Sequence, residues 1–440
     1  MIAAETDAYQ DAHQRLDDAR ADTFPDWLRE LSARAMNQFT TLGIPTTRDE
    51  DWRFTNITPF AARSFRIAEP VDVAASRIES LVNDAILDAE FHRLVFINGR
   101  YTPQWSHLHA LPDGVIAESV AESILTHPQS IESRLGQHLA FEHSAFIALN
   151  TAFIEDGANI VVPDDIIVDR PFHLIFLSVA DEPAFSHPRN LISIGKNSRA
   201  TLIESYRGLD GAGYFTNAVT EVTLHDSAYL DHHKLQHEQL DALHVATTLI
   251  FQEASSHFSS HYFSFGGDLS RNELNCRLDG ERAQCTLNGL YMPTGDQHMD
   301  CRTRIDHVRA HCNSFEIYKG ILDDRSKGVF NGKIYVHQDA QKTDAKQSNQ
   351  ALLLSDDATV DTKPQLEIYA DDVRCTHGAT VGELDEQAIY YLRSRGIPAD
   401  LARTMLIFAF ANDVVRGVEV PALRQHLESI LLADHGLDNV

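Results

Sequence analysis

The sequence predicts a mainly β protein with a repeating β architecture at its centre, an N-terminal α/β region and a C-terminal helical domain. Three observations support this prediction. Between about residues 159 and 374, short β-branched and aromatic runs alternate with small polar clusters, and hardly any helical periodicity interrupts them. Clear helical patterns are confined to the two ends of the chain. The third observation is a regular spacing of turn-like clusters within the central region.

These turn clusters recur at an almost constant interval. They lie at residues 197–198, 226–227, 253–255 and 280–281, and their spacings of 29, 27 and 27 residues are close to one coil of a solenoid. Each cluster precedes an alternating apolar run, as a strand after a turn would. The period weakens beyond Cys285, and a β-sandwich or a jelly roll remains an alternative on spacing alone.

Residues 1–157 form the expected N-terminal domain, in which helices and strands are mixed. One helix is predicted from Pro25, which suits a first turn, to Gly43, which ends the pattern. A hairpin is predicted at Asn98 and Gly99, because this pair accepts the positive φ angles of a tight turn after an apolar run. Further helical patterns lie between residues 116 and 153. The apolar positions of the helix that begins at Pro25 are Trp27, Leu28, Leu31, Ala35 and Phe39.

The solenoid core is expected over residues 158–380, and a helical domain over residues 381–440. In that last domain, Asp385 is a candidate cap for one helix, and Pro398 and Pro421 begin two more. About fifty residues cannot bury all their apolar positions alone, so part of this domain should pack on the β region or on another protein. The apolar residues of the second helix include Leu401, Met405 and Phe408.

Composition excludes several classes of function. The formal net charge of -27, from 37 Lys and Arg against 64 Asp and Glu, argues against nucleic-acid binding. Five widely spaced cysteines fit a reducing compartment, and we expect a cytoplasmic protein. The N-terminus lacks the pattern of a signal peptide, and no apolar stretch is long enough to span a bilayer, so no membrane association is expected.

Cys375 and His377 are the strongest candidate functional residues. They lie two positions apart on a predicted strand, so their side chains should project from the same face. A thiol and an imidazole on one face can act as two soft metal ligands. The spacing alone is weak evidence, since a buried cysteine beside a hydrogen-bonded histidine would produce it as well.

The sequence around this pair resembles the SufB/SufD family of iron–sulfur cluster assembly scaffolds. The resemblance covers nearly the whole chain. In the final segment, Gly378 follows Cys375-Thr-His377 where SufB-like chains carry a glutamate, and this is similar to the SufD branch. The segments that carry the resemblance are residues 49–55 (DEDWRFT), 95–100 (VFINGR), 146–153 (FIALNTAF), 313–323 (NSFEIYKGILD), 328–336 (GVFNGKIYV), 340–349 (AQKTDAKQSN), 364–368 (PQLEI), 375–386 (CTHGATVGELDE) and 390–397 (YYLRSRGI).

The resemblance implies a right-handed parallel β-helix and a non-catalytic subunit of a complex that builds iron–sulfur clusters. The implied partners are SufB, bound through the β-helix, and the SufC ATPase, bound through the C-terminal helices around Leu401, Met405 and Phe408. His377 is the first candidate ligand of a transient cluster shared with SufB, because a neutral imidazole suits iron. Cys375 is the second candidate, as a ligand, a sulfur acceptor or a core residue. A homodimer of the isolated chain stays open as an alternative.

Nucleotide and flavin chemistry cannot be derived from the residues. The stretch at 328–334 has three residues between its glycines where a phosphate-binding loop has four, and Ile334 lacks a hydroxyl for magnesium. We therefore expect ATP hydrolysis to come from SufC. Residues 211–216 lack the third glycine of a dinucleotide fingerprint, so reduced flavin in the complex remains open.

Two further groups of residues are candidate sites. A series of histidines would suit a metal if the coils stacked them in register, but hydrogen-bonded or solvated imidazoles are the preferred interpretation, because no cysteine or zinc motif accompanies them. Four other cysteines are expected to be buried small hydrophobes. These residues are His225, His232, His233, His237, His244, His257 and His261, and Cys276, Cys285, Cys301 and Cys312.

Two other functions remain open on the sequence. A β-helix carbohydrate-active enzyme could use Asp296, Asp300 and Asp306 on one face of the solenoid. The missing secretion signal and the context of Cys375 argue against it. A self-sufficient scaffold of the SufB type is the other alternative, and Gly378 argues against that.

Overall fold

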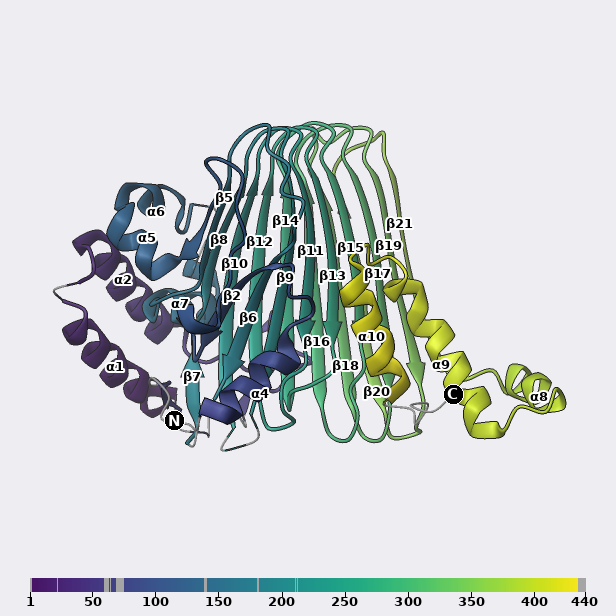
Figure 1. The fold of residues 1–440 in the computed structure, drawn as a ribbon. Helices are drawn as coiled ribbons and strands as arrows, with labels where there is room; N and C mark the ends of the chain where they lie inside the picture. The colour runs from purple at the N-terminus through teal and green to yellow at the C-terminus, as the bar shows by residue number, and fades with distance from the viewer. Residues whose placement is uncertain are drawn as a thin grey trace.

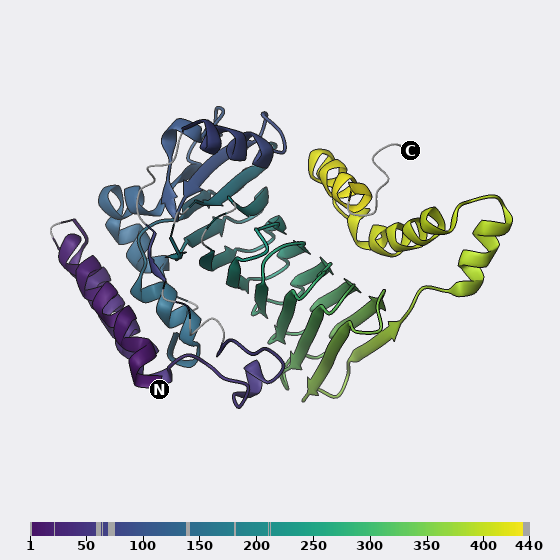
Figure 2. The same cartoon turned by 90° about the horizontal axis from the view of Figure 1, so that it is seen from below.

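The computed structural model describes residues 2–21, 23–58, 63, 65–68, 75–137, 141–179, 182–209, 211 and 213–433. Two long, mostly parallel sheets face each other and are wound from one continuous chain, as Figures 1 and 2 show. The mainly β architecture is therefore confirmed, and it is a parallel β-helix rather than a sandwich or a jelly roll. None of the described helices combines the length and the apolar character needed to cross a lipid bilayer.

Each coil of the β-helix contributes one strand to each sheet. The first sheet runs β20-β18-β16-β14-β12-β10-β8-β5-β4, and the second runs β21-β19-β17-β15-β13-β11-β9-β6-β2-β3. The strands of the solenoid are β5 (Ala158–Val162), β6 (Phe172–Ser178), β7 (Ala184–Ser186), β8 (Arg189–Ile194), β9 (Arg199–Gly208), β10 (Tyr214–Leu224), β11 (Tyr229–Gln236), β12 (Leu243–Gln252), β13 (His257–Ser264), β14 (Leu269–Leu278), β15 (Gln284–Tyr291), β16 (His298–His307), β17 (Asn313–Leu322), β18 (Lys327–Val336), β19 (Asp344–Leu353), β20 (Thr359–Ile368) and β21 (Arg374–Gly382).

The predicted turn clusters are confirmed as the corners between strands. Asn197, Ser227, Ser255 and Arg282 each adopt the left-handed conformation, with φ between 56 and 64°. Small polar side chains tolerate this region better than β-branched ones do. The backbone N–H of each residue donates to a carbonyl in the next coil, as Ser227 does to Ala254 at 2.8 Å. One repeated turn therefore sets the register of the whole stack.

The N-terminal region packs on both sheets. The helices that carry Tyr9, Phe39 and Phe146 lie against β10, β12 and β14 of the first sheet, whereas the helix at residues 75–85 lies against β6 and β9 of the second. The helix predicted from Pro25 is confirmed, because Pro25 is the N-cap of α2 and Gly43 its C-cap. The hairpin is also confirmed, with Asn98 at φ 53° and Gly99 at φ 78°. The elements are α1 (Ile2–Ala19), α2 (Asp26–Leu42), η1 (Glu50–Trp52), β1 (Arg66–Ile67), α4 (Ala75–Ala85), β2 (His92–Ile97), β3 (Arg100–Tyr101), η2 (Pro103–Trp105), β4 (Ile116–Ser119), α5 (Val120–Thr126), α6 (Pro128–Arg134), η3 (Phe141–His143) and α7 (Ala145–Ala152).

One local prediction in this region was wrong. The helical pattern was expected to begin near Ile116, but Ile116–Ser119 is the strand β4, which pairs antiparallel with β5. The helices α5, α6 and α7 follow it. The division at residue 157 stays a prediction, because β4 and β2 lie before it and yet pair with β5 and β6 of the solenoid.

The C-terminal helices are α8 (Glu386–Ser394), α9 (Ala399–Val415) and α10 (Pro421–Ala433). The cap at Asp385 is confirmed, since its side chain accepts a hydrogen bond from the backbone N–H of Gln387 at 2.8 Å. The expected packing on the β region is found as well. The second half of α9 and all of α10 cover the outer face of the second sheet, where Val414, Val415 and Leu423 are buried against strands β9 to β19.

The interior of the β-helix is apolar with buried polar groups at intervals. A column of aromatic and aliphatic side chains fills it, including Phe258, Tyr262 and Tyr291. Among them, the carboxylate of Glu204 accepts a hydrogen bond from Tyr206 at 2.6 Å and lies 3.1 Å from the ring nitrogen Nε2 of His232. Satisfied networks of this kind fix a single packing arrangement, because each buried polar group needs its partner.

Glu316 is a less satisfied buried group and gives a pH-dependent stability. One carboxyl oxygen accepts a hydrogen bond from Gln347 at 2.7 Å, and the other has no partner among the described residues. Burial raises the pKa of Glu316 from 4.5 to about 7. The folded protein therefore keeps a proton that the unfolded chain loses, and stability should fall as pH rises from about 4.5 through 7.

Replacing Glu316 with Gln should remove the loss of stability that accompanies rising pH. We expect Glu316→Gln to increase the free energy of unfolding at pH 8 by up to about 3 kcal/mol, and to have little effect near pH 4.5. Urea denaturation at the two pH values measures the difference. The exposed Glu281→Gln is the control and should change stability at neither pH. An equal effect of Glu316→Gln at both pH values would contradict this account.

Candidate functional site

The β-helix ends in an open coil. The strands β20 and β21 are the last in the two sheets, and each pairs with a strand on one side only among the described residues. Unpaired N–H and C=O groups of an edge strand can accept a further strand. The terminal coil is thus the part of the solenoid best suited to pair with another chain.

Both candidate ligands lie on this final strand. Cys375 pairs in register with Ala345, and His377 with Gln347. Ala345 and Gln347 are buried within the stack, so side chains at 375 and 377 follow the column that faces the interior of the β-helix. Within the described part of the chain, no further coil covers that column. His377 is exposed as a result, while Cys375 is half-buried against Ile334 and Ala345.

The electrostatics of the two residues differ. Burial raises the pKa of the Cys375 thiol, and the backbone hydrogen bond at Ala345 opposes this only in part. Cys375 therefore carries a proton at neutral pH unless a metal or cation displaces it. The imidazole of His377 makes no side-chain hydrogen bond with another described residue, so the unprotonated ring nitrogen of its neutral form is available to coordinate a metal.

The terminal coil does not form a complete metal site alone. Neither Cys375 nor His377 belongs to a group of three potential ligands within the described part of the chain. Iron in proteins usually has four or more ligands. The remaining ligands would have to come from a substrate or another protein. Exposed apolar side chains elsewhere on the terminal coil could surround such a contact: Ile368 and Tyr369 at the end of β20, and Val381 on β21.

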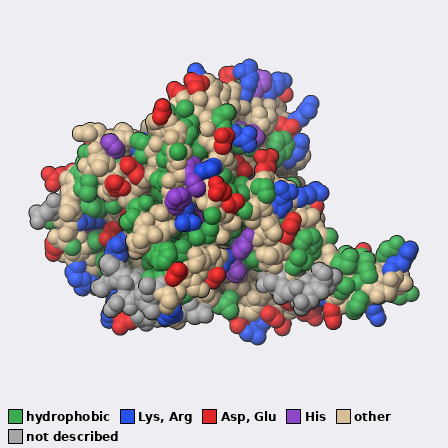
Figure 3. Space-filling model, viewed as in Figure 1, with side chains coloured by type: hydrophobic (Ala, Val, Ile, Leu, Met, Phe, Trp, Pro, Cys, Tyr) green, Lys and Arg blue, Asp and Glu red, His purple; other side chains and the backbone are tan. Residues whose placement is uncertain are grey.

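The C-terminal helices present a second exposed apolar surface. In Figures 1 and 2, α8 projects away from the β-helix, and hydrophobic side chains are visible on this end in Figure 3. Tyr390 is 74% exposed and Met405 is 42% exposed. Leu401 is half-buried, whereas Phe408 packs partly against the core under α9 and α10. Of the three predicted docking residues, Met405 is thus the most accessible and Phe408 serves partly in packing.

Most of the other candidate residues are dispersed, although the coils do stack His233 beside His261. His232 and His244 are buried inside the β-helix, where a hydrogen bond joins His232 to Glu204. His225 lies at the surface 3.2 Å from Glu253. The four cysteines expected to be core residues are buried, as predicted: Cys276, Cys285, Cys301 and Cys312. The histidines on or beside the outer face of the second sheet are His233, His237, His257 and His261.

The three aspartates of the carbohydrate-enzyme alternative are each held by an arginine. Asp296 pairs with Arg325 at 2.6 Å in an exposed turn. Asp300 is buried in a pair with Arg271, and Asp306 pairs with a third arginine, Arg304. Neutralised, separated carboxylates do not provide the facing acid and base that glycoside cleavage needs.

The fold brings together one group of side chains that the sequence predicted only in part: His233 and His261 were candidates for a metal site if the coils stacked them in register, but Asp231 was not among the candidates. Asp231 and His233 on β11 lie beside His261 on β13, all buried, with one potential ligand atom from each within 4.8 Å of the others. The signal was present in the Asp-x-His spacing and in a coil period that places His233 next to His261. It could not be used without the strand register.

The fold and its open end define a β-helical protein with a soft-ligand pair on an unpaired terminal coil. Comparison with known proteins identifies the family. Residues 3–174 match the SufBD protein N-terminal region, and residues 176–410 match the SUF system FeS cluster assembly, SufBD core domain. The chain therefore belongs to the SufBD family of iron–sulfur cluster assembly proteins, and it is a homologue of SufD.

Individual relatives agree with this assignment. The chain is 34% identical over 397 residues to the iron–sulfur cluster assembly SufBD family protein slr0076 of Synechocystis sp., covering 88% of this chain and 86% of that protein. It is also 34% identical over 397 residues to the iron–sulfur cluster assembly protein SufD of Escherichia coli, covering 89% of each. The SufD protein of Bacillus subtilis is 25% identical over 426 residues, or 92% of this chain and 94% of that protein.

Proposed function

We propose that this chain is a non-catalytic scaffold subunit that pairs with SufB through its terminal coil and supplies His377, with Cys375, to an iron–sulfur cluster assembled at that contact. The observation that carries the proposal is the incomplete ligand pair at an unpaired solenoid end. Two soft ligands face the open interior column of β21, and no third ligand joins them within the described residues. A partner solenoid would add both a paired strand and the missing ligands.

The cluster is cargo rather than a resident cofactor in this proposal. A site that shares its ligands between two chains and contains an exposed imidazole holds iron less firmly than four thiolates in one chain. Release to a recipient protein is then feasible. The self-sufficient SufB-type scaffold is disfavoured, because Gly378 offers no side chain where SufB-like chains place a carboxylate.

Copurification tests this function. The chain is produced alone, with SufB, and with SufB and SufC, and iron and acid-labile sulfide are measured per purified complex. We expect a stable complex with SufB and cluster only when both solenoids are present. A chain that stays monomeric and does not bind SufB at micromolar concentration would refute the pairing. Self-association through the same coil would show up as a homodimer of the chain purified alone.

We further propose that the exposed apolar surface of α8 and the first half of α9 binds the SufC ATPase, which would supply ATP hydrolysis. Aromatic side chains that remain exposed in the isolated chain are common anchors of protein interfaces. Truncation after Val381 is a poor test, because removal of α9 and α10 would uncover buried strand residues such as Phe263 and Leu290. Point substitutions on exposed positions avoid this problem.

The double substitution Tyr390→Asp with Met405→Asp should weaken SufC binding on the order of 10- to 100-fold, because charge would replace two exposed apolar contacts. Affinity for SufB should not change, since β20 and β21 are untouched. Isothermal titration calorimetry measures both affinities. Leu125→Asp is the matched control, since Leu125 is 65% exposed on α5. Equal SufC affinity in the double variant and the control would argue against this docking surface.

A further inference from the structure

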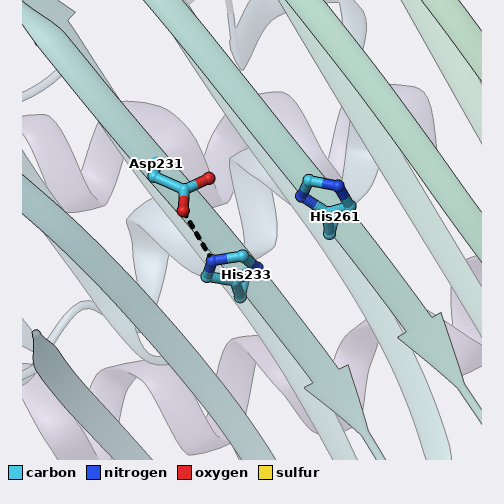
Figure 4. Close-up of side chains that lie close together, drawn as sticks. All are labelled: Asp231, His233 and His261. Carbon is cyan, nitrogen blue, oxygen red and sulfur yellow. Dashed lines mark hydrogen bonds and ion pairs between the residues drawn. The ribbon is translucent and has the colours of Figure 1, made fainter. Parts of the chain in front are cut away.

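Asp231, His233 and His261 form a compact group on the outer face of the second sheet. Asp231 and His233 are two residues apart on β11, and His261 is the register partner of His233 on β13. Figure 4 shows the three side chains on the same side of these neighbouring strands. The Nε2 atom of His233 lies 2.9 Å from a carboxyl oxygen of Asp231, and the two imidazole rings stack with their centres 5.3 Å apart.

The group is enclosed rather than displayed at the surface. Asp231 is 4% exposed, His233 is fully buried and His261 is 4% exposed. The connection between α9 and α10 passes over it, since a Cβ atom built on Gly417 would lie 3.0 Å from Nε2 of His261. Bulk solvent therefore cannot provide hydrogen-bond partners for the polar atoms of the group.

The known contacts leave the group unsatisfied. Asp231 satisfies one ring nitrogen of His233, and Asn288 lies 3.1 Å from Nε2 of His261. The Nδ1 atoms of both imidazoles are buried without a hydrogen-bond partner among the described residues. In Figure 4 one ring nitrogen of His261 faces Asp231 and His233. Unpaired buried nitrogens are costly, so two in one cluster suggest a missing occupant.

The donor set matches a divalent transition-metal ion. Burial raises the pKa of Asp231, but the hydrogen bond and charge of His233 outweigh that effect and leave the pKa below its usual value. The group thus offers one carboxylate and two imidazoles, the combination found at mononuclear iron and zinc sites. It contains no thiolate, which distinguishes it from a site for an iron–sulfur cluster.

We propose that Asp231, His233 and His261 bind a single divalent first-row transition-metal ion, separate from the cluster site at β21. Their ligand atoms lie within 4.8 Å of one another, so small side-chain rotations would bring each to the metal distance of about 2.0–2.2 Å. The ion joins two adjacent coils beneath the segment at Gly417.

Metal titration of the full chain tests this inference. The titrations use the chain carrying Cys375→Ser and His377→Ala, so that β21 contributes no metal ligand and the result does not depend on the cluster proposal. After chelator treatment, Co²⁺ and Zn²⁺ are added. We expect one equivalent to bind, with the visible absorption of Co²⁺ bound to nitrogen and oxygen, and Zn²⁺ to raise the unfolding temperature.

Isosteric variants locate the site. Asp231→Asn and His261→Gln should each raise the dissociation constant of the ion by at least about 10- to 100-fold. Loss of a residue that only hydrogen-bonds to a metal ligand typically has an effect of this size, and loss of a direct ligand should cost no less. His225→Gln is the matched control, because His225 and Glu253 form a histidine–carboxylate pair at the surface. It should bind the ion unchanged.

Several results would overturn the proposal. They are equal affinity in all variants, absence of a stoichiometric ion in the parent chain, or X-ray absorption showing sulfur ligands. If one variant fails to fold, the other variant and the absorption spectrum of the parent chain still decide the question. Circular dichroism at low temperature checks the fold of each variant.

Discussion

Replacing His377 with Ala is expected to lower the iron and acid-labile sulfide of the assembled complex by at least about 10-fold, because an exposed ligand is lost from a site that has few. The complex itself should still form. His377 makes no described hydrogen bond and contributes little buried surface, so stability should change by less than about 0.5 kcal/mol. Cluster content per complex and rescue of cluster-dependent enzymes in cells lacking the endogenous subunit are the measurements.

Comparison variants separate a ligand from a general effect. His337→Ala removes a half-buried imidazole just after β18 and should leave the cluster content unchanged. Cys375→Ser should lower the cluster content less than His377→Ala if sulfur transfer runs mainly through SufB, and comparably if the thiol is a ligand. Full loading and full rescue by the His377→Ala, Cys375→Ser double variant would leave the chain a purely structural partner.

Val381→Asp should abolish pairing with SufB, weakening the affinity on the order of 100-fold or more. Val381 is 49% exposed in the isolated chain and follows the same inward-facing column as His377, above Ala351. A second solenoid stacked on β21 would bury the new carboxylate without a partner, which is strongly unfavourable. Analytical ultracentrifugation of the mixed chains measures the loss.

The opposite face of the same strand provides the control. Thr376 pairs with the exposed Lys346, so its side chain lies outside the column. Thr376→Asp should therefore retain most of the affinity. Normal SufB binding by Val381→Asp would mean that the partner docks elsewhere, and the unpaired terminal coil would lose its proposed role.

Local chemistry made much of this fold predictable from sequence. The turns at Asn197 and Ser227 and the hairpin at Asn98 depend on residues that tolerate positive φ, and the helix limits at Pro25 and Gly43 depend on similar backbone preferences. These signals require no knowledge of distant contacts. The strand at residues 116–119 was not predictable in this way, because its four residues are extended only through pairing with β5.

In the candidate site, too, the features set by local sequence were predictable and those set by distant strand pairing were not. That Cys375 and His377 share a face follows from the two-residue period of a strand. Their exposure does not, since it depends on β21 being the last strand of its sheet. The group at Asp231 required still more information, because His233 lies 28 residues before its register partner His261, whereas Asp344 lies 30 residues before its register partner Arg374. Coil lengths that vary by a few residues hide such neighbours from any fixed period.

The one-sided pairing of β21 also bears on timing. A strand held by hydrogen bonds along a single edge opens more readily than strands held along both, so β21 is less firmly fixed than the strands inside the stack. Arrival of a partner coil would complete its hydrogen bonding and fix the positions of His377 and Cys375 together. Iron that reaches the chain before the partner would find two loosely placed donors. Iron that arrives after the partner has paired with β21 would find an ordered site. Under the proposed function, the unfinished end of the solenoid would thus make cluster construction conditional on assembly of the complex.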